Sequence, residues 1–367
     1  MVDVTATYPA KTIVLQDIAD VKYIRLETLP KFMIDNTDVR YMDDEIVIFT
    51  NRQEDIMIFD SRTGKGVSSF NRKGRGSGEY VYVGPMTVDR ERGEIFVRDA
   101  NNLPVYVYDM HGKHIRTLDF KKNLDKMDFF HDWNDGHLFY YNSYSPQRPD
   151  EMPYRLVSKT DTVMTDLPLR LEGRDHMYVR HDFSNGSYMA SSMDDVSLAK
   201  ISDGYMISEP GLDTIFSWDR NTGALTPVMV RVPSFHSMEY PIGLFYMGES
   251  SGYMFLQTIE RKMEFDGTFE DIMNGTQPRS FKKVNLVYDK NDGLFYEGKL
   301  VNGDFTDERE FSLSNNFGIS AGWKTTVLQP YELLELQEAG KLRGKLAEVA
   351  LTLKEDNNPV LMIVTFK

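Results

Sequence analysis

A short unit occurs twice in the first third of the chain, and this repeat limits the fold more than any other feature. Residues 45–49 read EIVIF and residues 94–98 read EIFVR, so the two copies start 49 residues apart. The next apolar segments, 55–60 and 104–109, both end in an aspartate, and a Gly-Lys pair follows each of them. Agreement in apolar pattern, terminal aspartate and turn indicates that one structural unit is used repeatedly.

Each copy predicts four short strands joined by tight turns. In the second copy the strands are expected at the positions 86–88, 94–98, 105–108 and 114–118. Alternating or wholly apolar runs of four to six residues between Gly and Asp turns are typical of β-strands. A repeated unit of four antiparallel strands is typical of a β-propeller blade.

Looser copies extend this pattern over the whole chain and predict one all-β domain, 1–367. The fold class is a six-bladed β-propeller of four-stranded antiparallel blades. The blades are expected at 38–70, 84–120, 127–170, 187–232, 242–302, and 317–329 together with 358–367 and 20–28. Strands from the N- and C-terminal ends therefore close the ring, which removes the exposed sheet edges of an open ring.

A short helical insertion is expected near the C-terminus, at 330–354. Leucines recur there at roughly helical spacing, Pro330 stands at the start, and Gly340 and Gly344 interrupt the segment. This composition favours one or two short helices before the last strand. Packing against the outside of a blade is the main interpretation, and a docking surface for a partner is the alternative.

Composition excludes several classes of function. The net charge of −14 and the pI near 5.0 argue against nucleic acid as a partner, since phosphate binding needs a basic face. The chain has no cysteine, so it has neither disulfides nor thiolate chemistry. No apolar run reaches the length of a membrane span, and residues 1–11 show no signal peptide.

Three features together resemble a known family. These are the loop 74–80 (GRGSGEY) before a blade, the Phe-Asp or Tyr-Asp strand ends followed by Gly-Lys turns, and the late helix leading to 356–363 (DNNPVLMI). They resemble the six-bladed β-propeller lipoproteins of Bacteroidetes, which are relatives of NHL-repeat propellers. The resemblance implies a location at the cell envelope, in the periplasm or anchored to the outer membrane. It implies no particular activity.

The longest loops of a propeller surround the channel mouth, and we expect them to form one functional face. The loops concerned are 71–82, 99–103, 143–152, 173–186, 234–241 and 260–281. Arginines on such loops match carboxylates or phosphates, and aromatic rings stack on sugars or peptide side chains. The residues predicted to bind ligand are Arg75, Arg98, Arg148, Arg180, His181, Tyr82, Trp133 and Tyr240. The alternative is that these arginines pair with nearby carboxylates and that the aromatics pack between blades.

Few features of the sequence indicate a catalytic site. The glycine-rich loop 74–78 precedes a strand, so it lacks the helix N-terminus of a phosphate site and is expected to be structural. No nucleophile motif occurs. Calcium bound by Asp128, Asp182 and Glu239 is the alternative, because oxygen ligands from separate blades need no sequence spacing.

The sequence thus favours a non-catalytic propeller at the cell envelope over an enzyme. It would bind a ligand or a protein on one rim, with an anionic or carbohydrate ligand and no cofactor. Nucleic acid is not expected as a partner, and a membrane is expected only through a lipid anchor. A calcium-dependent hydrolase or lactonase that uses the channel mouth is the alternative function. A scaffold that docks a protein partner is the third hypothesis.

Overall fold

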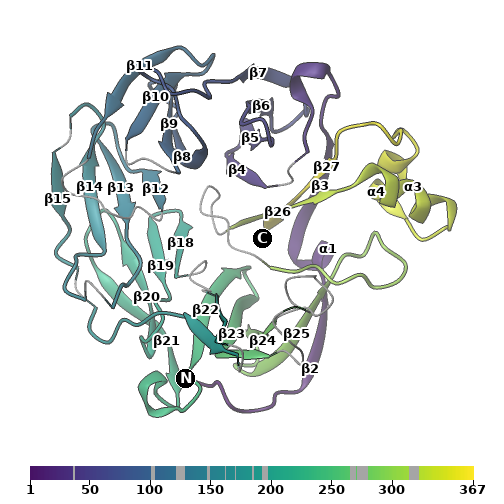
Figure 1. Ribbon diagram of the computed structural model, residues 1–367. Helices are drawn as coiled ribbons and strands as arrows, with labels where there is room; N and C mark the ends of the chain where they lie inside the picture. The colour runs from purple at the N-terminus through teal and green to yellow at the C-terminus, as the bar shows by residue number, and fades with distance from the viewer. Residues whose placement is uncertain are drawn as a thin grey trace.

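The computed structural model describes most of residues 1–367. The description leaves out 36–37, 101–103, 121–128, 147–148, 162, 170, 184–185, 192–196, 265–269, 271–279 and 314–321. The described chain forms a ring of β-sheets around a central axis (Figure 1). This is the six-bladed propeller that the sequence predicts.

The blades follow the chain in order, each with its first strand nearest the axis. Blade 1 contains β4 (Val39–Met42), β5 (Ile46–Thr50), β6 (Ile56–Asp60) and β7 (Gly66–Phe70), and blade 2 contains β8 (Val83–Asp89), β9 (Glu94–Asp99), β10 (Val105–Asp109) and β11 (His114–Leu118). Blade 3 contains β12 (Phe129–Asp132), β13 (His137–Tyr141), β14 (Tyr154–Ser158) and β15 (Met164–Asp166), and blade 4 contains β18 (Leu198–Ile201), β19 (Gly204–Ile207), β20 (Thr214–Asp219) and β21 (Leu225–Val232). Blade 5 contains β22 (Ile242–Glu249), β23 (Tyr253–Glu264), β24 (Ser280–Asp289) and β25 (Phe295–Val301), and blade 6 contains β26 (Trp323–Leu328), β27 (Val360–Phe366) and β3 (Ala19–Arg25).

Each blade is buried on both faces, which explains the wholly apolar strands. In β5, Ile46 and Ile48 pack into the core shared with blade 2, whereas Val47 and Phe49 pack toward blade 6. Successive side chains of a strand point to opposite faces, so one strand supplies two inter-blade cores. A strand between two packed sheets therefore reads as a continuous apolar run.

The recurrent aspartate fastens the turn that follows the third strand of a blade. The Oδ1 atom of Asp60 accepts hydrogen bonds from the backbone N–H groups of Arg62 (3.0 Å) and Thr63 (2.7 Å). Equivalent aspartates at the ends of β10, β20 and β24 accept backbone N–H groups in the same way. Gly64 closes the first of these turns with φ of +72°, a conformation that favours glycine.

Blade 4 differs from the prediction in its innermost strand. The sequence predicted that blade 4 begins at 187, but β17 (Tyr188–Ser191) pairs with β16 (Val179–Asp182) in a separate hairpin. The innermost strand is β18, where Leu198 and Ala199 are buried. Tyr188 is 56% exposed, so the apolar appearance of its segment did not reflect a place in the core.

The N-terminal segment crosses the outer edges of two blades before it completes the ring. β1 (Val2–Asp3) pairs in parallel with β21, and β2 (Ala10–Val14) pairs in parallel with β25. β3 then pairs with β27, so strands from both ends of the chain close blade 6 as predicted. The sequence analysis did not place β1 and β2, because short edge strands carry little pattern of their own.

The C-terminal helical insertion consists of α3 (Pro330–Glu338) and α4 (Gly344–Ala350), beside blade 6 (Figure 1). Leu333, Leu346 and Ala350 are buried in one cluster with residues of β27 and β3. Among the described residues the remaining helical segments are α1 (Leu15–Ile18) and the 3-10 turns η1 (Pro30–Phe32) and η2 (Phe235–Ser237). None of the described helices is long and apolar enough to cross a membrane.

The substitution Asp60→Ala should lower the free energy of unfolding by about 1 kcal/mol, because it removes the acceptor of the turn N–H groups. Hydrogen bonds from Thr63, and then from the turn backbone, hold the pKa of Asp60 below its usual range. The stability that Asp60 contributes is therefore fully present above the unfolded-state pKa of about 3.9. It is lost as the pH falls through the pKa of Asp60 in the folded protein. Urea unfolding of both proteins between pH 7 and pH 3 measures this difference.

The control is Asp44→Ala, which removes an exposed carboxylate from a neighbouring turn of the same blade. It should leave stability almost unchanged. An equal loss in both variants would contradict the role of Asp60.

Candidate functional site

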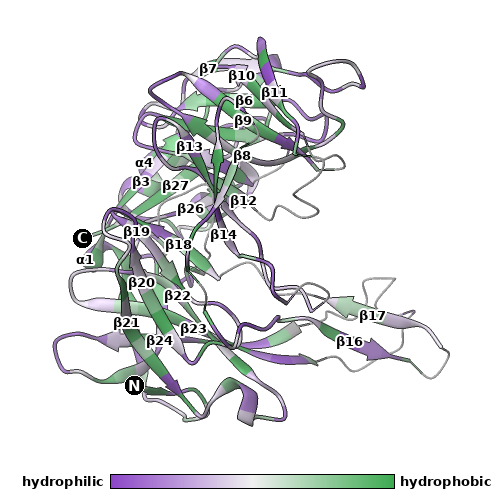
Figure 2. Ribbon diagram, turned by 90° about the vertical axis from the view of Figure 1, so that its left-hand side faces the viewer, coloured by the Kyte–Doolittle hydropathy of each residue, from purple (hydrophilic) through white to green (hydrophobic). Residues whose placement is uncertain are grey.

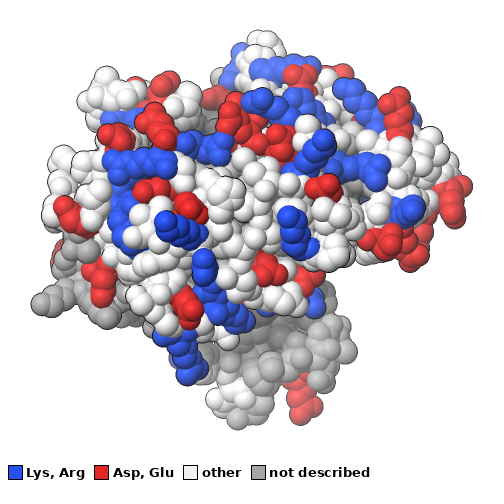
Figure 3. Space-filling model, turned by 90° about the horizontal axis from the view of Figure 1, so that it is seen from above, with Lys and Arg blue, Asp and Glu red and all other residues white. Residues whose placement is uncertain are grey.

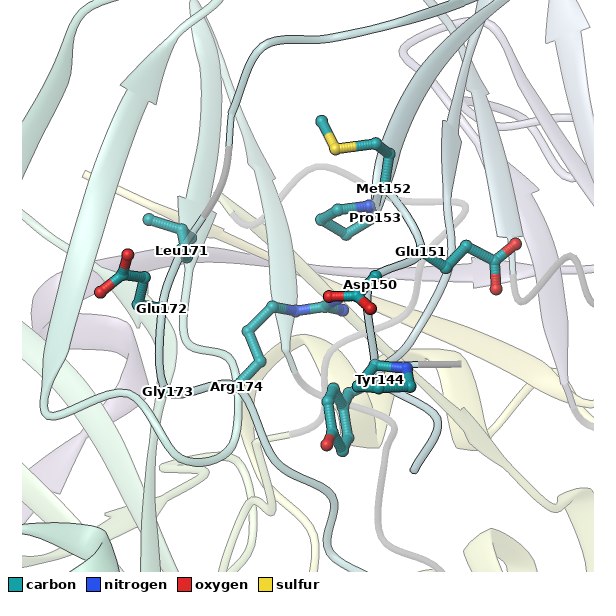
Figure 4. Close-up of a pocket in the computed structure, with 10 residues that line it drawn as sticks. Tyr144, Asp150, Glu151, Met152, Pro153, Leu171, Glu172, Gly173 and Arg174 are labelled. Atoms are coloured by element: carbon teal, nitrogen blue, oxygen red, sulfur yellow. The ribbon is translucent and has the colours of Figure 1, made fainter. Parts of the chain in front are cut away.

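A pocket of about 330 Å³ opens between two connections of blade 3 (Figure 4). One is the loop between β13 and β14, and the other is the segment between β15 and β16. The lining residues are Tyr144, Pro149, Asp150, Glu151, Met152, Pro153, Leu171, Glu172, Gly173 and Arg174. The volume is at the lower end of the range for small-molecule sites.

A buried arginine forms the floor of the pocket. The Arg174 side chain is 8% exposed, and its Nε lies 3.0 Å from Oε2 of the fully buried Glu209, without the alignment of a hydrogen bond. Its Nη2 donates to the carbonyl oxygen of Asn142 at 3.0 Å. Tyr154 Oη donates to Glu209 Oε1 at 2.8 Å. Since Glu209 belongs to blade 4, these contacts join two blades beneath the pocket.

The charge states of Arg174 and Tyr154 follow from their contacts. Burial opposes the charged form of Arg174, but the adjacent Glu209 carboxylate outweighs it and raises the pKa of Arg174. Burial, and then Glu209, raise the pKa of Tyr154 well above its usual value, so its hydroxyl stays a donor. Arg174 Nη1 makes no hydrogen bond to a described residue. The floor therefore offers a fixed charged donor to whatever fills the pocket.

The rim of the pocket is acidic and partly aromatic. Asp150 and Glu172 are exposed, whereas Glu151 is half-buried beside Arg155 at 3.6 Å. Figure 4 shows the Arg174 side chain reaching across the pocket toward the loop that carries Asp150. The Tyr144 ring lies 6.0 Å from the Arg174 guanidinium carbon. The lining carries three carboxylates, of which Glu151 is paired with Arg155, and Arg174 is already paired with Glu209, so this lining does not suit an anion.

Other connections contact the segment between β15 and β16. Asp175 Oδ2 lies 3.0 Å from Arg261 Nη1, and His236 Nε2 lies 3.0 Å from the Gly173 carbonyl oxygen. Gly211 has φ of +89°, and a Cβ there would lie 2.2 Å from the Gly173 oxygen, so glycine permits this close approach. Parts of four predicted loops, 143–152, 173–186, 234–241 and 260–281, thus meet around the pocket.

The predicted arginines and aromatics on blades 1 and 2 do not line this pocket. Arg75 is exposed in the connection between those blades, and Tyr82 is 46% exposed beneath Lys73 at 5.3 Å. Arg98 is half-buried in β9. Arg148 lies outside the described residues.

Trp133 was expected on the rim, but the structure places it in the core between blades 3 and 4. Its ring stacks on Phe139 (5.3 Å) and Trp218 (5.6 Å). This is the alternative that the sequence analysis left open for the aromatics. Tyr240 is 45% exposed, with Lys262 lying 4.6 Å from its ring.

The remaining predicted residues lie mainly on the β16–β17 hairpin. Arg180 is exposed and pairs with Asp182 at 2.7 Å, whereas His181 contacts the Phe183 ring at 4.8 Å. Glu239 is exposed, and Asp128 lies outside the described residues. Over the ranges that the structure describes, no three His, Cys, Asp or Glu side chains are grouped to hold a metal ion.

Most of the pocket lining lies on the predicted loops 143–152 and 173–186, but the residues predicted to bind ligand did not include Arg174 or Glu209. Arg174 and Glu209 are 35 positions apart and no motif connects them. The one signal was Glu209 itself, a charged residue two positions after the end of the apolar strand β19.

Comparison with known protein families shows to which family this chain belongs. A family model described as a domain of unknown function, DUF4934, matches residues 1–365. The chain belongs to the DUF4934 family. No functionally curated protein matches this member of the family.

Solved structures are similar to this DUF4934 protein at low sequence identity. A "putative exported protein" of Bacteroides fragilis NCTC 9343 is 15% identical with a TM-score of 0.62, over 98% of this chain and 99% of that chain. A member of the DUF4221 family from Bacteroides vulgatus ATCC 8482 is 11% identical with a TM-score of 0.45, over 96% and 99%. The first of these likenesses supports the propeller fold of this chain.

The substitution Glu209→Ala should lower the free energy of unfolding by about 3–5 kcal/mol, because it leaves the buried Arg174 charge without its partner. Replacing both residues, as Arg174→Met with Glu209→Leu, should recover most of that loss. Denaturant unfolding of the two variants measures both effects.

The matched control is Asp182→Ala, which breaks an exposed arginine–aspartate pair on the hairpin. It should cause no measurable loss. If Glu209→Ala is no more destabilising than this control, the buried pair does not hold the two blades together.

Proposed function

We propose that this DUF4934 protein is a non-catalytic binding propeller of the cell envelope and that it binds a glycan in the pocket floored by Arg174. The observation that carries the proposal is a buried, permanently charged arginine beneath a rim of carboxylates, whose Nη1 donor makes no hydrogen bond to a described residue. A site with both fixed donors and acceptors matches hydroxyl groups, which donate and accept at once.

The shape of the lining supports a sugar ring over an anion. Tyr144 offers an aromatic face, and Pro149, Met152, Pro153 and Leu171 add apolar surface. A sugar ring has apolar C–H faces and a polar edge, so it suits a pocket that combines an aromatic wall with a few polar groups. The three carboxylates of the rim would repel a phosphate or a carboxylate. A neutral glycan therefore fits better than the anionic ligand that the sequence also allowed.

Other surface properties agree with a binding protein that acts outside the cytoplasm. On the face seen from above in Figure 3, basic and acidic side chains are interspersed and not gathered by sign, which does not favour nucleic acid. The resemblance to lipoproteins and the description of the Bacteroides fragilis neighbour as exported both support an envelope location.

Figure 2 shows that the β16–β17 hairpin lies on the side of the propeller opposite the N-terminus. The hairpin is therefore accessible to a ligand in solution.

The direct test is binding of neutral and acidic oligosaccharides, followed by thermal unfolding and by titration calorimetry. A neutral glycan should stabilise the folded protein by about 2.7 kcal/mol at one hundred times its dissociation constant. Tyr144→Ala should weaken this binding up to about tenfold by removing the stacking surface.

Tyr82→Ala is the matched control, since it removes an exposed tyrosine ring from the connection between blades 1 and 2, away from the pocket. It should leave affinity unchanged. Failure of every neutral glycan to bind, or equal loss in both variants, would overturn the proposal.

A further inference from the structure

The β16–β17 hairpin has two chemically different faces. The pairs Arg180 with Ala190 and Asp182 with Tyr188 are directly opposite in the ladder. Opposed residues share a face and successive residues alternate. Arg180, Asp182 and Tyr188 therefore lie on one face, and His181 and Met189 lie on the other. We call the first face, together with Tyr178 directly before β16, the tyrosine face.

The tyrosine face is accessible and its side chains are held in place by one another. Tyr178 is 43% exposed and Tyr188 is 56% exposed. The Arg180 guanidinium carbon lies 4.2 Å from the centre of the Tyr188 ring, and its Nη2 lies 2.7 Å from Asp182 Oδ1. The face therefore presents two aromatic rings together with a fixed donor and a fixed acceptor.

A row of rings connects the pocket to this face. The Tyr144 ring in the pocket wall lies 6.4 Å from the His176 ring, which lies 5.9 Å from the Tyr178 ring. From there the tyrosine face continues outward along β16, over about 13 Å from Tyr178 to Asp182 at ~3.3 Å per residue. Figure 2 shows the hairpin projecting beyond the blades. The pocket and the tyrosine face are thus parts of one continuous surface.

We propose that the tyrosine face extends the pocket into a binding site for an oligosaccharide chain, in which successive sugar rings stack on Tyr144, Tyr178 and Tyr188. This inference rests on the proposed function, because it requires that the pocket binds a sugar. The pocket is small and open, so it holds only one end of a longer ligand.

A glycan fits the tyrosine face better than a protein segment does. The face has separate rings divided by a charged pair, and not the contiguous apolar patch that marks most protein interfaces. Arg180 and Asp182 offset each other in charge, and both keep polar atoms that can bind hydroxyl groups. The ligand is therefore expected to be a neutral chain.

The test is a length series of one neutral glycan, from the single sugar to the hexasaccharide, titrated against three proteins. In the wild type, affinity should increase with length. In the double variant Tyr178→Ala with Tyr188→Ala, that increase should fall up to about tenfold for each ring lost, while the affinity for the single sugar is unchanged. Tyr331→Ala, which removes an exposed tyrosine from α3 beside blade 6, should behave as the wild type.

Each outcome bears on a different part of the account. Length-independent binding that still requires Tyr144 would overturn the extended site and leave the pocket proposal standing. Equal weakening of short and long ligands in the double variant would also overturn it. Absence of binding at every length would overturn both proposals. The unfolding midpoints without ligand should agree among the three proteins, since the substituted side chains are exposed.

Discussion

Packing of each blade between its two neighbours is the constraint on which the whole structure depends. Inner strands such as β5 send alternate side chains into two different cores, so no blade has a hydrophobic core of its own. The stability of each blade therefore depends on its contacts with both neighbouring blades. The chain closes it with β3 and β27, drawn from its two ends, and the N-terminal segment adds β1 and β2 to the edges of blades 4 and 5.

The same constraint leaves the connections between strands available for binding. The strands alone form the hydrophobic core, so the loop between β13 and β14 and the segment after β15 need to be fixed only where they join the blades. Arg174, Glu209 and Tyr154 provide that base by joining blades 3 and 4 through a buried charged network. Desolvation of such a charged network costs free energy. Its main contribution is therefore that it holds the two connections in one arrangement. The exposed hairpin beyond them is then anchored at its root by Asp175 and Arg261.

The sequence predicted the parts of the structure that repeat. Asp60 and Gly64, with their equivalents in other blades, form turns whose backbone requirements restrict the residue type, so they remain visible as a pattern. The first strand of blade 4 was misplaced because 188–190 and 198–201 are both short and apolar, and only tertiary contacts distinguish them. Trp133 was misplaced because an aromatic residue near a strand end can face either solvent or the neighbouring blade. The pairing of Arg174 with Glu209 was not predicted because the two residues are remote in sequence, and pairing across blades leaves no spacing to recognise.

The central claim is that a sugar ring occupies the pocket above Arg174. The most direct measurement is a crystal structure of the protein with a bound neutral oligosaccharide. The account predicts a sugar ring against Tyr144, with a hydroxyl group within hydrogen-bonding distance of Arg174 Nη1. A glycan bound at another place, such as the central channel or blades 1 and 2, with this pocket empty, would contradict it.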